Sequence, residues 1–378
     1  MGQREPRVAI VTDPLVQRGG AERCAEVLAG IFPQAPIFAI LYSPTTGPAS
    51  LAARVTTSPL GRIPGGARRH RWLLPFYPAA VESFDLSGYE VIISLHHSAA
   101  KGLLRGADQY HICYCCTPMR ALWERRSEVG AHLPILARPL AAALLRRQRI
   151  WDYVTAARVD RFVAISQTAR RRIAKHYGRE SEVLYPPIDV VRFSPGRSSR
   201  DGDYYLVASR LVPYKRIDLA VAATAALGRK LVIVGRGPEA HLVRAPHVTY
   251  LGHVHDEELV DLMRGARAMI FPADDDFGMA PVEMMACGKP VVALAAGGAL
   301  ETVVDGVTGV FANAQTVEAF VRAISALEQR RFDPERIRAH AERFSRESFA
   351  RAFRRLVDEA PPPPAMRSLN GAPSAMPT

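Results

Sequence analysis

Short apolar runs recur along this chain and are separated by stretches with helical periodicity. In the first half they lie at residues 8–12, 91–94, 111–115, 162–166 and 182–185. In the second half they lie at residues 204–208, 231–235, 248–252, 268–272 and 290–294. Runs that are apolar almost throughout suit strands covered on both faces. Amphipathic stretches between them, such as 217–227 and 256–266, favour an α/β protein with parallel, doubly wound sheets.

A change in composition divides the chain. Residues 186–204 are rich in proline, glycine, serine and charge, which is typical of a linker. The series of apolar runs then restarts, so we place a boundary at residue 198 and expect domains at 1–198 and 199–344. A last helical stretch, 345–360, is expected to pack back on the first domain. The proline-rich tail, 361–378, is expected to be disordered.

The composition favours a two-domain globular protein. A chain of 378 residues with 48% hydrophobic and 23% charged residues has room for two cores. No apolar run reaches bilayer length, and the first residues contain no signal-peptide core. The five cysteines fit neither a zinc pattern nor a disulfide framework. We therefore expect a reduced, cytoplasmic setting.

The formal net charge of +12 suggests an anionic partner, which could be nucleic acid, a membrane surface or a phosphorylated substrate. Arginines cluster at Arg68–Arg71 and Arg146–Arg149. Solvated helix faces explain such clusters about equally well. Nucleic acid is the weakest of the three partners, because no nucleic-acid-binding motif is present.

The segment 274–287, DDDFGMAPVEMMAC, contains the most unusual carboxylate of the chain. Glu283 stands among apolar residues, where burial is costly unless the carboxylate is bonded, so it is a candidate ligand contact. Asp274 and Asp276 have the spacing of an Asp-x-Asp metal site. Metal is the weaker interpretation here, because no third acidic ligand lies nearby in the sequence.

Two glycine pairs follow predicted strands. Gly19 and Gly20 stand before a helix, where a backbone can approach a diphosphate. Gly235 and Gly237 could let a base or ribose lie against the backbone. Taken alone, an ordinary tight turn is the stronger interpretation of each pair.

Three other polar residues also follow strands. Arg210 and Lys215 could hold one diphosphate, although exposed loop cations would look the same. His97 could bond a substrate hydroxyl or act as acid or base, although a lone histidine is more often structural.

Several ordered motifs give the chain a family resemblance. They include GGAER, DRFVAISQTARRRIAKHYG, VLYPPIDVVRF, SRLVPYKRIDLAV, VGRGPE and FPADDDFGMAPVEMMACGKPVVA. From about residue 8 to residue 357 the chain resembles retaining glycosyltransferases with two facing Rossmann-like domains and a cleft between them, the GT-B fold of group 1 and family 4. Within that class it looks most like bacterial mannosyltransferases that use GDP-mannose to build O-antigen or exopolysaccharide.

The resemblance implies roles in donor binding. The family's E-x7-E motif falls on Asp275 and Glu283. Glu283 would then bond the nucleotide ribose, and Asp275 would meet the donor-sugar hydroxyls beside the amides of Phe277, Gly278 and Met279.

The resemblance also implies how the cleft works. Arg210 and Lys215 would hold the diphosphate and stabilise the charge that grows as it leaves. His97 fits a family histidine in its own loop. It would take up part of the role of another family histidine, which faces the donor sugar from the position that Cys116 occupies here. The C-terminal domain would bind the nucleotide and the N-terminal domain the acceptor. No cofactor or metal ion is implied.

Two residues depart from the family pattern. Asp275 stands where glutamate is usual, which leaves Asp274 and Asp276 as rivals for its role. Cys116 stands where close members have histidine, and a thiol is a weaker hydrogen-bonding group. Both changes bear on donor choice and rate.

We therefore expect a retaining transferase that moves a hexose, mannose by resemblance, to a hydroxyl of a lipid-linked glycan in surface polysaccharide synthesis. Its basic clusters would dock on an anionic membrane at the inner face of the cell membrane. Two alternatives are a nucleotide-sugar epimerase on the same fold and a catalytically decayed nucleotide-sugar-binding protein.

Overall fold

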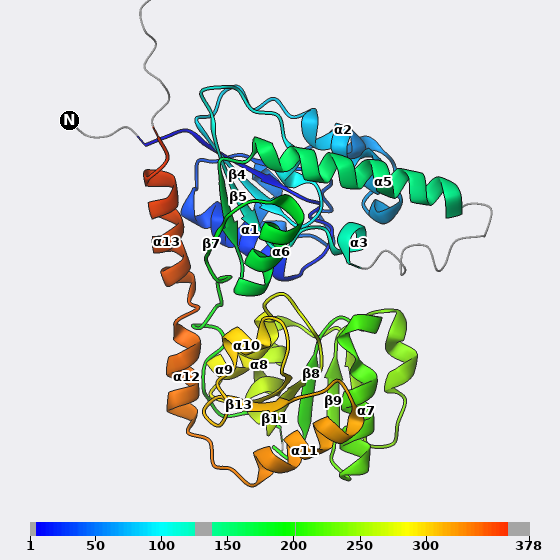
Figure 1. Cartoon of the computed structure of the whole chain (residues 1–378). Coiled ribbons are helices and arrows are strands. Elements are labelled where there is room, and N and C mark those ends of the chain that lie inside the picture. The colour runs from blue at the N-terminus through cyan, green and yellow to red at the C-terminus, as the bar shows by residue number, and fades with distance from the viewer. Residues whose placement is uncertain (1–4, 125–137, 201, 362–378) are drawn as a thin grey trace, which may run out of the picture.

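The computed structural model describes residues 5–124, 138–200 and 202–361, which form two α/β domains, one above the other in Figure 1. The N-terminal sheet has the strand order β3-β2-β1-β4-β5-β6-β7, and the C-terminal sheet has the order β10-β9-β8-β11-β12-β13. Every pairing between these strands is parallel. In each sheet the order reverses beside the first strand of the domain, which creates a binding crevice at the carboxyl edge. The predicted fold class is confirmed.

The strands of the first sheet are β1 (Val8–Thr12), β2 (Ile37–Ala39), β3 (Val55–Thr57), β4 (Val91–His96), β5 (Tyr110–Cys115), β6 (Arg161–Ala164) and β7 (Glu182–Val183). Those of the second sheet are β8 (Tyr205–Ala208), β9 (Leu231–Val234), β10 (Val248–Gly252), β11 (Ala268–Phe271), β12 (Val291–Leu294) and β13 (Gly309–Ala312). Each predicted run contains a strand. The sequence analysis missed three short strands of three or four residues each, namely β2 (IFA), β3 (VTT) and β13 (GVFA).

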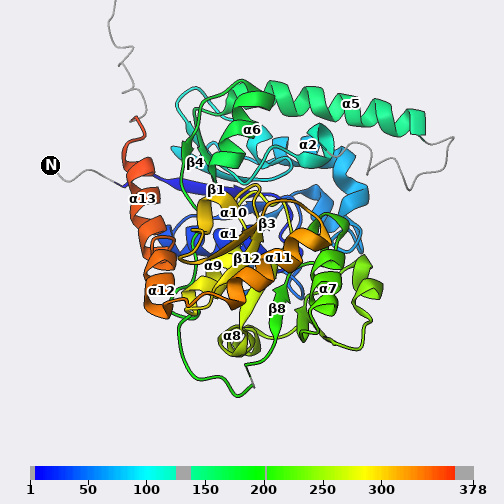
Figure 2. The same ribbon diagram turned by 60° about the horizontal axis from the view of Figure 1, so that its bottom comes forward.

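Helices cover both faces of each sheet (Figures 1 and 2). In the first domain they are α1 (Gly20–Ile31), α2 (Tyr77–Glu82), α3 (Arg120–Trp123), α5 (Arg138–Thr155) and α6 (Gln167–Tyr177). In the second they are α7 (Ile217–Ala226), α8 (Asp256–Gly265), α9 (Met279–Ala286), α10 (Ala299–Thr302) and α11 (Val317–Glu328), followed by α12 (Pro334–Glu342) and α13 (Arg346–Asp358). One apolar core cluster contains side chains from both domains, Leu28 and Met284 among them. The two domains therefore share part of their core.

The last helix returns to the first domain. Helix α12 lies beside the C-terminal domain, and α13 continues upward along the N-terminal domain (Figure 1). The ring of Phe353 lies 6.3 Å from that of Phe32 and 5.8 Å from that of Tyr114, centroid to centroid. The predicted boundary at residue 198 falls between β7 and β8. The predicted disordered tail lies, from residue 362 onward, outside the described residues.

Candidate functional site in the interdomain cleft

The acidic turn after β11 brings Asp275 against Lys215. Lys215 ends the short 3₁₀ helix η7 (Pro213–Lys215) and is buried. Its Nζ donates to Oδ2 of Asp275 over 2.5 Å. Burial alone would raise the pKa of Asp275, but the charges of Lys215, Arg120 and Arg210 together lower it. Asp275 is therefore an ionised carboxylate held by a cation from a different strand end.

Arg210 takes a different position from Lys215. Its Nη2 donates to the hydroxyl of Tyr214 over 2.7 Å, and the residue is exposed. The guanidinium is thus within electrostatic range of Asp275 but, within the described part of the chain, is not hydrogen-bonded to it. The carboxyl end of β8 is therefore followed by one exposed positive charge, on Arg210, and one buried positive charge, on Lys215.

Asp276 faces the opposite domain. Its carboxylate pairs with Arg172 of α6 and lies 3.7 Å from Nη1 of Arg120 of α3. Glu124 joins the same network, since its carboxylate accepts from Nε of Arg172 over 2.7 Å and lies 3.4 Å from Nε of Arg120. Asp276 is therefore a link between domains. Asp274, which the sequence left as the other rival, has a separate position beside Gly297.

Glu283 is buried on α9, as its apolar neighbours predicted, with 4% of its surface exposed. Its carboxylate accepts a hydrogen bond from Nη1 of Arg23, which lies on α1 of the other domain. Nη2 of Arg23 lies 3.6 Å from Asp256. Burial raises the pKa of Glu283, and the charge of Arg23 opposes that rise. Sequence reasoning missed Arg23, although it is part of the GGAER motif.

The first glycine pair lies at the domain interface. A Cβ atom on Gly20 would lie 2.7 Å from Sδ of Met279, the first residue of α9. The amide of Gly19 donates to Oε2 of Glu22 over 3.0 Å. Gly278, with φ of +84°, turns the chain into α9. The structure thus places Gly20 and Met279 in contact across the cleft.

Phe277 and the second glycine pair, which the sequence predicted as ligand contacts, pack against other parts of the protein. The ring of Phe277 is buried and lies 5.6 Å from the ring of Phe344, so only its backbone remains for a ligand. Gly235 and Gly237 let two strand ends pass closely, because added Cβ atoms would lie 1.7 Å from the carbonyl oxygen of Ser209 and 2.0 Å from that of Leu211. Close packing thus accounts for both glycines, whether or not a nucleotide also lies there.

His97 follows β4 on a loop that Asp13 holds. Asp13 directly follows β1, and its carboxylate is 2% exposed. It accepts from the amides of His97 (2.6 Å), Ser98 (2.8 Å), Ala99 (2.7 Å) and Ala100 (3.1 Å), and from the hydroxyl of Ser98 (2.6 Å). Burial would raise the pKa of Asp13, but nearby histidines and these bonds lower it to about 2. Asp13 was missed because an acid after a strand usually means a turn.

The imidazole of His97 is partly exposed, and its Nδ1 lies 3.8 Å from Oδ2 of Asp13. A narrow slot beside it is lined by residues of the β1 end and of α1, including Glu22. Glu22 is buried, and burial raises its pKa while His97 opposes the rise. Among the described residues no hydrogen bond or ion pair joins His97 to Arg210, Lys215 or Asp275. The His97 loop and the group of Arg210, Lys215 and Asp275 are therefore separate.

Cys116 follows β5, and its amide donates to the carbonyl of His96 over 2.8 Å. Burial raises the pKa of its thiol well above the ordinary value. Within residues 5–124, 138–200 and 202–361, no group of three or more His, Cys, Asp or Glu side chains is arranged to hold a metal ion. No helix in the same ranges is long and apolar enough to cross a membrane.

Comparisons with known proteins agree with this architecture. A family model described as "Glycosyltransferase Family 4" matches residues 18–192, and one described as "Glycosyl transferases group 1" matches residues 193–344. The D-inositol 3-phosphate glycosyltransferase of Geodermatophilus obscurus is 30% identical over 221 residues, which are 49% of each chain. That of Acidothermus cellulolyticus is 32% identical over 231 residues, 51% of each chain. The chain thus matches about half the length of these curated relatives.

Solved structures match nearly the whole chain. Anabaena Alr3699/HepE in complex with UDP-glucose has a TM-score of 0.68 and 19% identity, covering 93% of this chain and 99% of that one. Sucrose-phosphate synthase from Thermosynechococcus elongatus has a TM-score of 0.66 and 16% identity, covering 93% of this chain and 98% of that one. At these identities the likeness establishes the fold and its two-domain arrangement.

Proposed function

We propose that this chain, which has the GT-B fold of the group 1 and family 4 glycosyltransferases, transfers a hexosyl group from a nucleotide sugar to an acceptor hydroxyl. The observation that carries the proposal is the Lys215–Asp275 pair, because two strand ends place a fixed cation and an ionised carboxylate together in the cleft. A nucleotide sugar presents the complementary groups, namely a diphosphate for the cation and hydroxyls for the carboxylate. Ligands of such sheets bind at this edge.

The proposed reaction retains the configuration at the anomeric carbon. The bond from that carbon to the diphosphate oxygen breaks while the acceptor oxygen bonds to the same face. The acceptor proton passes to the departing diphosphate. Lys215 and Arg210 stabilise the negative charge that grows on the diphosphate, and preorganised electrostatic stabilisation of this kind often contributes more to catalysis than any other effect.

Two residues adjust the donor site in this scheme. The Asp275 side chain is one methylene shorter than that of glutamate. It contacts the sugar hydroxyls directly only if the acidic turn lies close to the sugar, and otherwise it contacts them through a water molecule. Glu283 bonds the ribose only after Arg23 shares or releases its carboxylate, because that guanidinium occupies it here. Donor binding is therefore linked to the approach of the two domains.

Motif likeness favours GDP-mannose as donor and a lipid-linked glycan as acceptor. Two findings favour other substrates: the curated relatives are named for D-inositol 3-phosphate, and the Anabaena neighbour binds UDP-glucose. We therefore keep mannosyl transfer to a lipid-linked glycan as the finer proposal and include the other substrates in its test.

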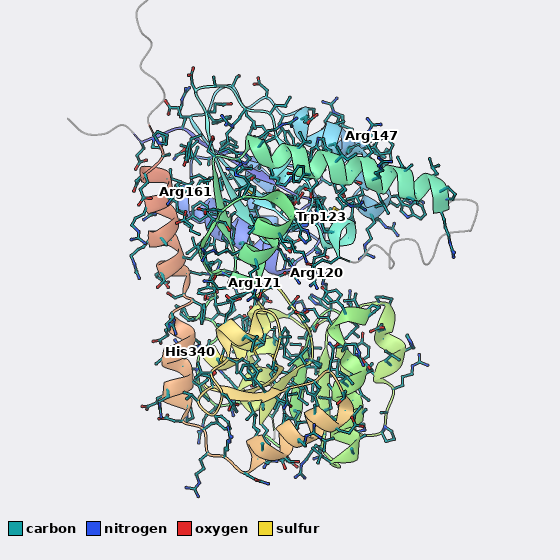
Figure 3. All side chains as sticks on the ribbon, viewed as in Figure 1. Arg120, Trp123, Arg147, Arg161, Arg171 and His340 are labelled. Carbon is teal, nitrogen blue, oxygen red and sulfur yellow. The ribbon has the colours of Figure 1, made fainter. Side chains whose placement is uncertain are left out.

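A basic and apolar surface of the first domain supports docking on an anionic membrane. Trp72 of the 3₁₀ helix η3 (His70–Phe76) is 74% exposed, and Leu140 of α5 is 66% exposed. The two elements are joined where Nε2 of Gln148 donates to the carbonyl of Leu74 over 2.8 Å. Arg147, labelled in Figure 3, also lies on α5. Exposed aromatic and aliphatic side chains beside arginines suit a lipid interface.

Changing Arg68, Arg69 and Arg71 together to glutamate should abolish sedimentation with vesicles that contain anionic lipid, because each cation near such a surface contributes about 1 kcal/mol. Glutamate substitution of Arg351, Arg354 and Arg355 on α13 is the matched control. Equal sedimentation of the two triple variants would remove the membrane from the proposal.

The direct test of the proposed function is a panel of GDP-mannose, UDP-glucose and UDP-N-acetylglucosamine with the purified chain. We expect hydrolysis of one donor without acceptor, and faster release of nucleotide with an acceptor present. The anomeric coupling constant of the product then reports retention. Interconversion of donor epimers without acceptor would favour the epimerase, and binding without turnover would favour a decayed enzyme.

A further inference from the structure

A cavity of about 270 Å³ opens between α6 and the acidic turn. It is lined by Thr168, Arg171, Arg172, Lys175, Asp274 and Gly297. Figure 3 shows Arg171 and Arg120 at the boundary between the two domains. The cavity therefore has one wall from each domain and lies next to the candidate donor-sugar residue Asp275.

The wall from α6 carries positive charge that lacks a carboxylate partner. Arg172 is neutralised by Asp276 and Glu124. Arg171 donates to the hydroxyl of Thr168, over 3.1 Å, and pairs with no carboxylate of the described residues. Lys175 forms no hydrogen bond or ion pair within the same part of the chain. Two cations one helical turn apart thus face the same space with their charge available.

One carboxylate near these cations, that of Glu301, is already hydrogen-bonded to the first turn of α6. Glu301 of α10 accepts from the amides of Gln167 (2.7 Å) and Thr168 (3.0 Å), and from the hydroxyl of Thr168. It caps α6 and, in the structure as described, pairs with neither Arg171 nor Lys175. The helix end is therefore satisfied by the protein itself, and the cations remain for a ligand.

The opposite wall supplies a free acceptor of hydrogen bonds. The Asp274 carboxylate forms no hydrogen bond or ion pair in the described part of the chain. It lies against Gly297, where an added Cβ atom would be 2.5 Å from its Oδ1 and 2.3 Å from the carbonyl oxygen of Asp275. Any side chain at position 297 would fill this end of the cavity. A carboxylate facing two cations suits a molecule with hydroxyls at one end and an anion at the other.

We propose that this cavity binds an acceptor that is a phosphorylated or carboxylated sugar or polyol. Arg171 and Lys175 hold its anionic group, and Asp274 accepts from its hydroxyls. This proposal rests on the proposed glycosyl transfer and names the chemical class of its acceptor. It also assigns Asp274 a task different from those of Asp275 and Asp276.

The test measures sugar binding without a donor. Glucose 6-phosphate and glucose are titrated by calorimetry into the full chain, into the double variant Arg171→Gln/Lys175→Gln, and into Arg170→Gln. Arg170 is an exposed cation of the same helix that does not line the cavity. Circular dichroism checks that all three proteins fold alike.

We expect the unchanged chain to bind glucose 6-phosphate more tightly than glucose. The double variant should lose about tenfold or more of that affinity, because it removes both charged hydrogen-bond donors from the anionic group. Arg170→Gln should change nothing. Equal affinity of the unchanged chain for both sugars, or an unaffected double variant, would overturn the proposal.

A second arm decides which substrate carries the anion. Hydrolysis of UDP-glucuronate and of UDP-glucose is compared in the same variants. A loss confined to UDP-glucuronate in the double variant would overturn the assignment to the acceptor, because the anion would then belong to the donor. If the chain hydrolyses no nucleotide sugar, the proposed function is contradicted. The calorimetric result still shows whether the cavity binds an anionic sugar.

Discussion

The loop of His97 in the first domain and the acidic turn in the second are held in different ways. The loop of His97 depends on one carboxylate of its own domain, because Asp13 bonds four consecutive amides and a hydroxyl. In the acidic turn, Asp275 pairs with Lys215 of its own domain, whereas Asp276 pairs with arginines of the other domain. The geometry of the His97 loop is thus set within its own domain, whereas that of the acidic turn depends partly on how closely the two domains approach.

The largest effect on activity should come from Lys215→Met. The substitution removes the buried cation of the proposed donor site, and loss of one preorganised group of this kind costs about 100- to 1,000-fold in kcat. Steady-state donor hydrolysis measures it, with Lys230→Met, an exposed lysine before β9, as control. A loss below about threefold would show that the donor side does not depend on this pair.

The largest effect on stability should come from Asp13→Asn. The amide cannot satisfy the same set of donors, and disruption of a buried, bonded carboxylate costs about 2–4 kcal/mol in the free energy of unfolding. Urea unfolding at pH 7 measures it. Asp85→Asn, which alters an exposed carboxylate bonded to Ser87, is the control and should differ little from the unchanged chain.

The pH dependence gives the same prediction a second readout. The pKa of Asp13 is lowered from 3.8 to about 2, so its stabilising effect is complete above about pH 4 and is lost as the pH falls toward 2. The difference in stability between the unchanged chain and Asp13→Asn should therefore shrink below pH 4. A constant difference across that range would mean that the carboxylate charge does not hold the loop.

A smaller effect is expected for Asp276→Asn. Its ion pairs with Arg172 and Arg120 are partly buried, so their loss should raise the KM for the donor by about three- to tenfold, with little change in kcat. Small-angle scattering should show a larger radius of gyration if the domains separate. Asp305→Asn, which alters an exposed pair with Arg330, is the control. An unchanged KM would mean that the turn keeps its shape without the other domain.

The sequence predicted more of the fold than of the cleft. Apolar runs locate strands such as β1 and β9 because burial on both faces constrains nearly every residue. The burial of Glu283 could also be predicted, since its neighbours on α9 are apolar. Its partner Arg23 could not, because 260 positions separate the two residues and only domain packing joins them.

The same reason explains the three aspartates. Residues 274, 275 and 276 are three consecutive aspartates. Their residue type is the same, so the sequence alone cannot assign different roles to them. Asp275 pairs with Lys215 of η7, Asp276 pairs with arginines of α6 and α3, and Asp274 lines the cavity beside α6. Only the folded chain brings these elements together. Asp13 was missed for a different reason. Most of its partners are backbone amides, which nearly every residue has, so the residue types do not show which amides it bonds.

The most direct test of the proposed donor site is the affinity of the chain for nucleoside diphosphates. Calorimetric titration of UDP and GDP should show binding of at least one of them. Glu283→Ala should weaken that binding by about tenfold or more, because it removes a buried acceptor from the proposed ribose site. Glu328→Ala, which removes a carboxylate bonded to Arg229 outside the cleft, should not. Equal affinity of the unchanged chain and Glu283→Ala would contradict the proposed donor site.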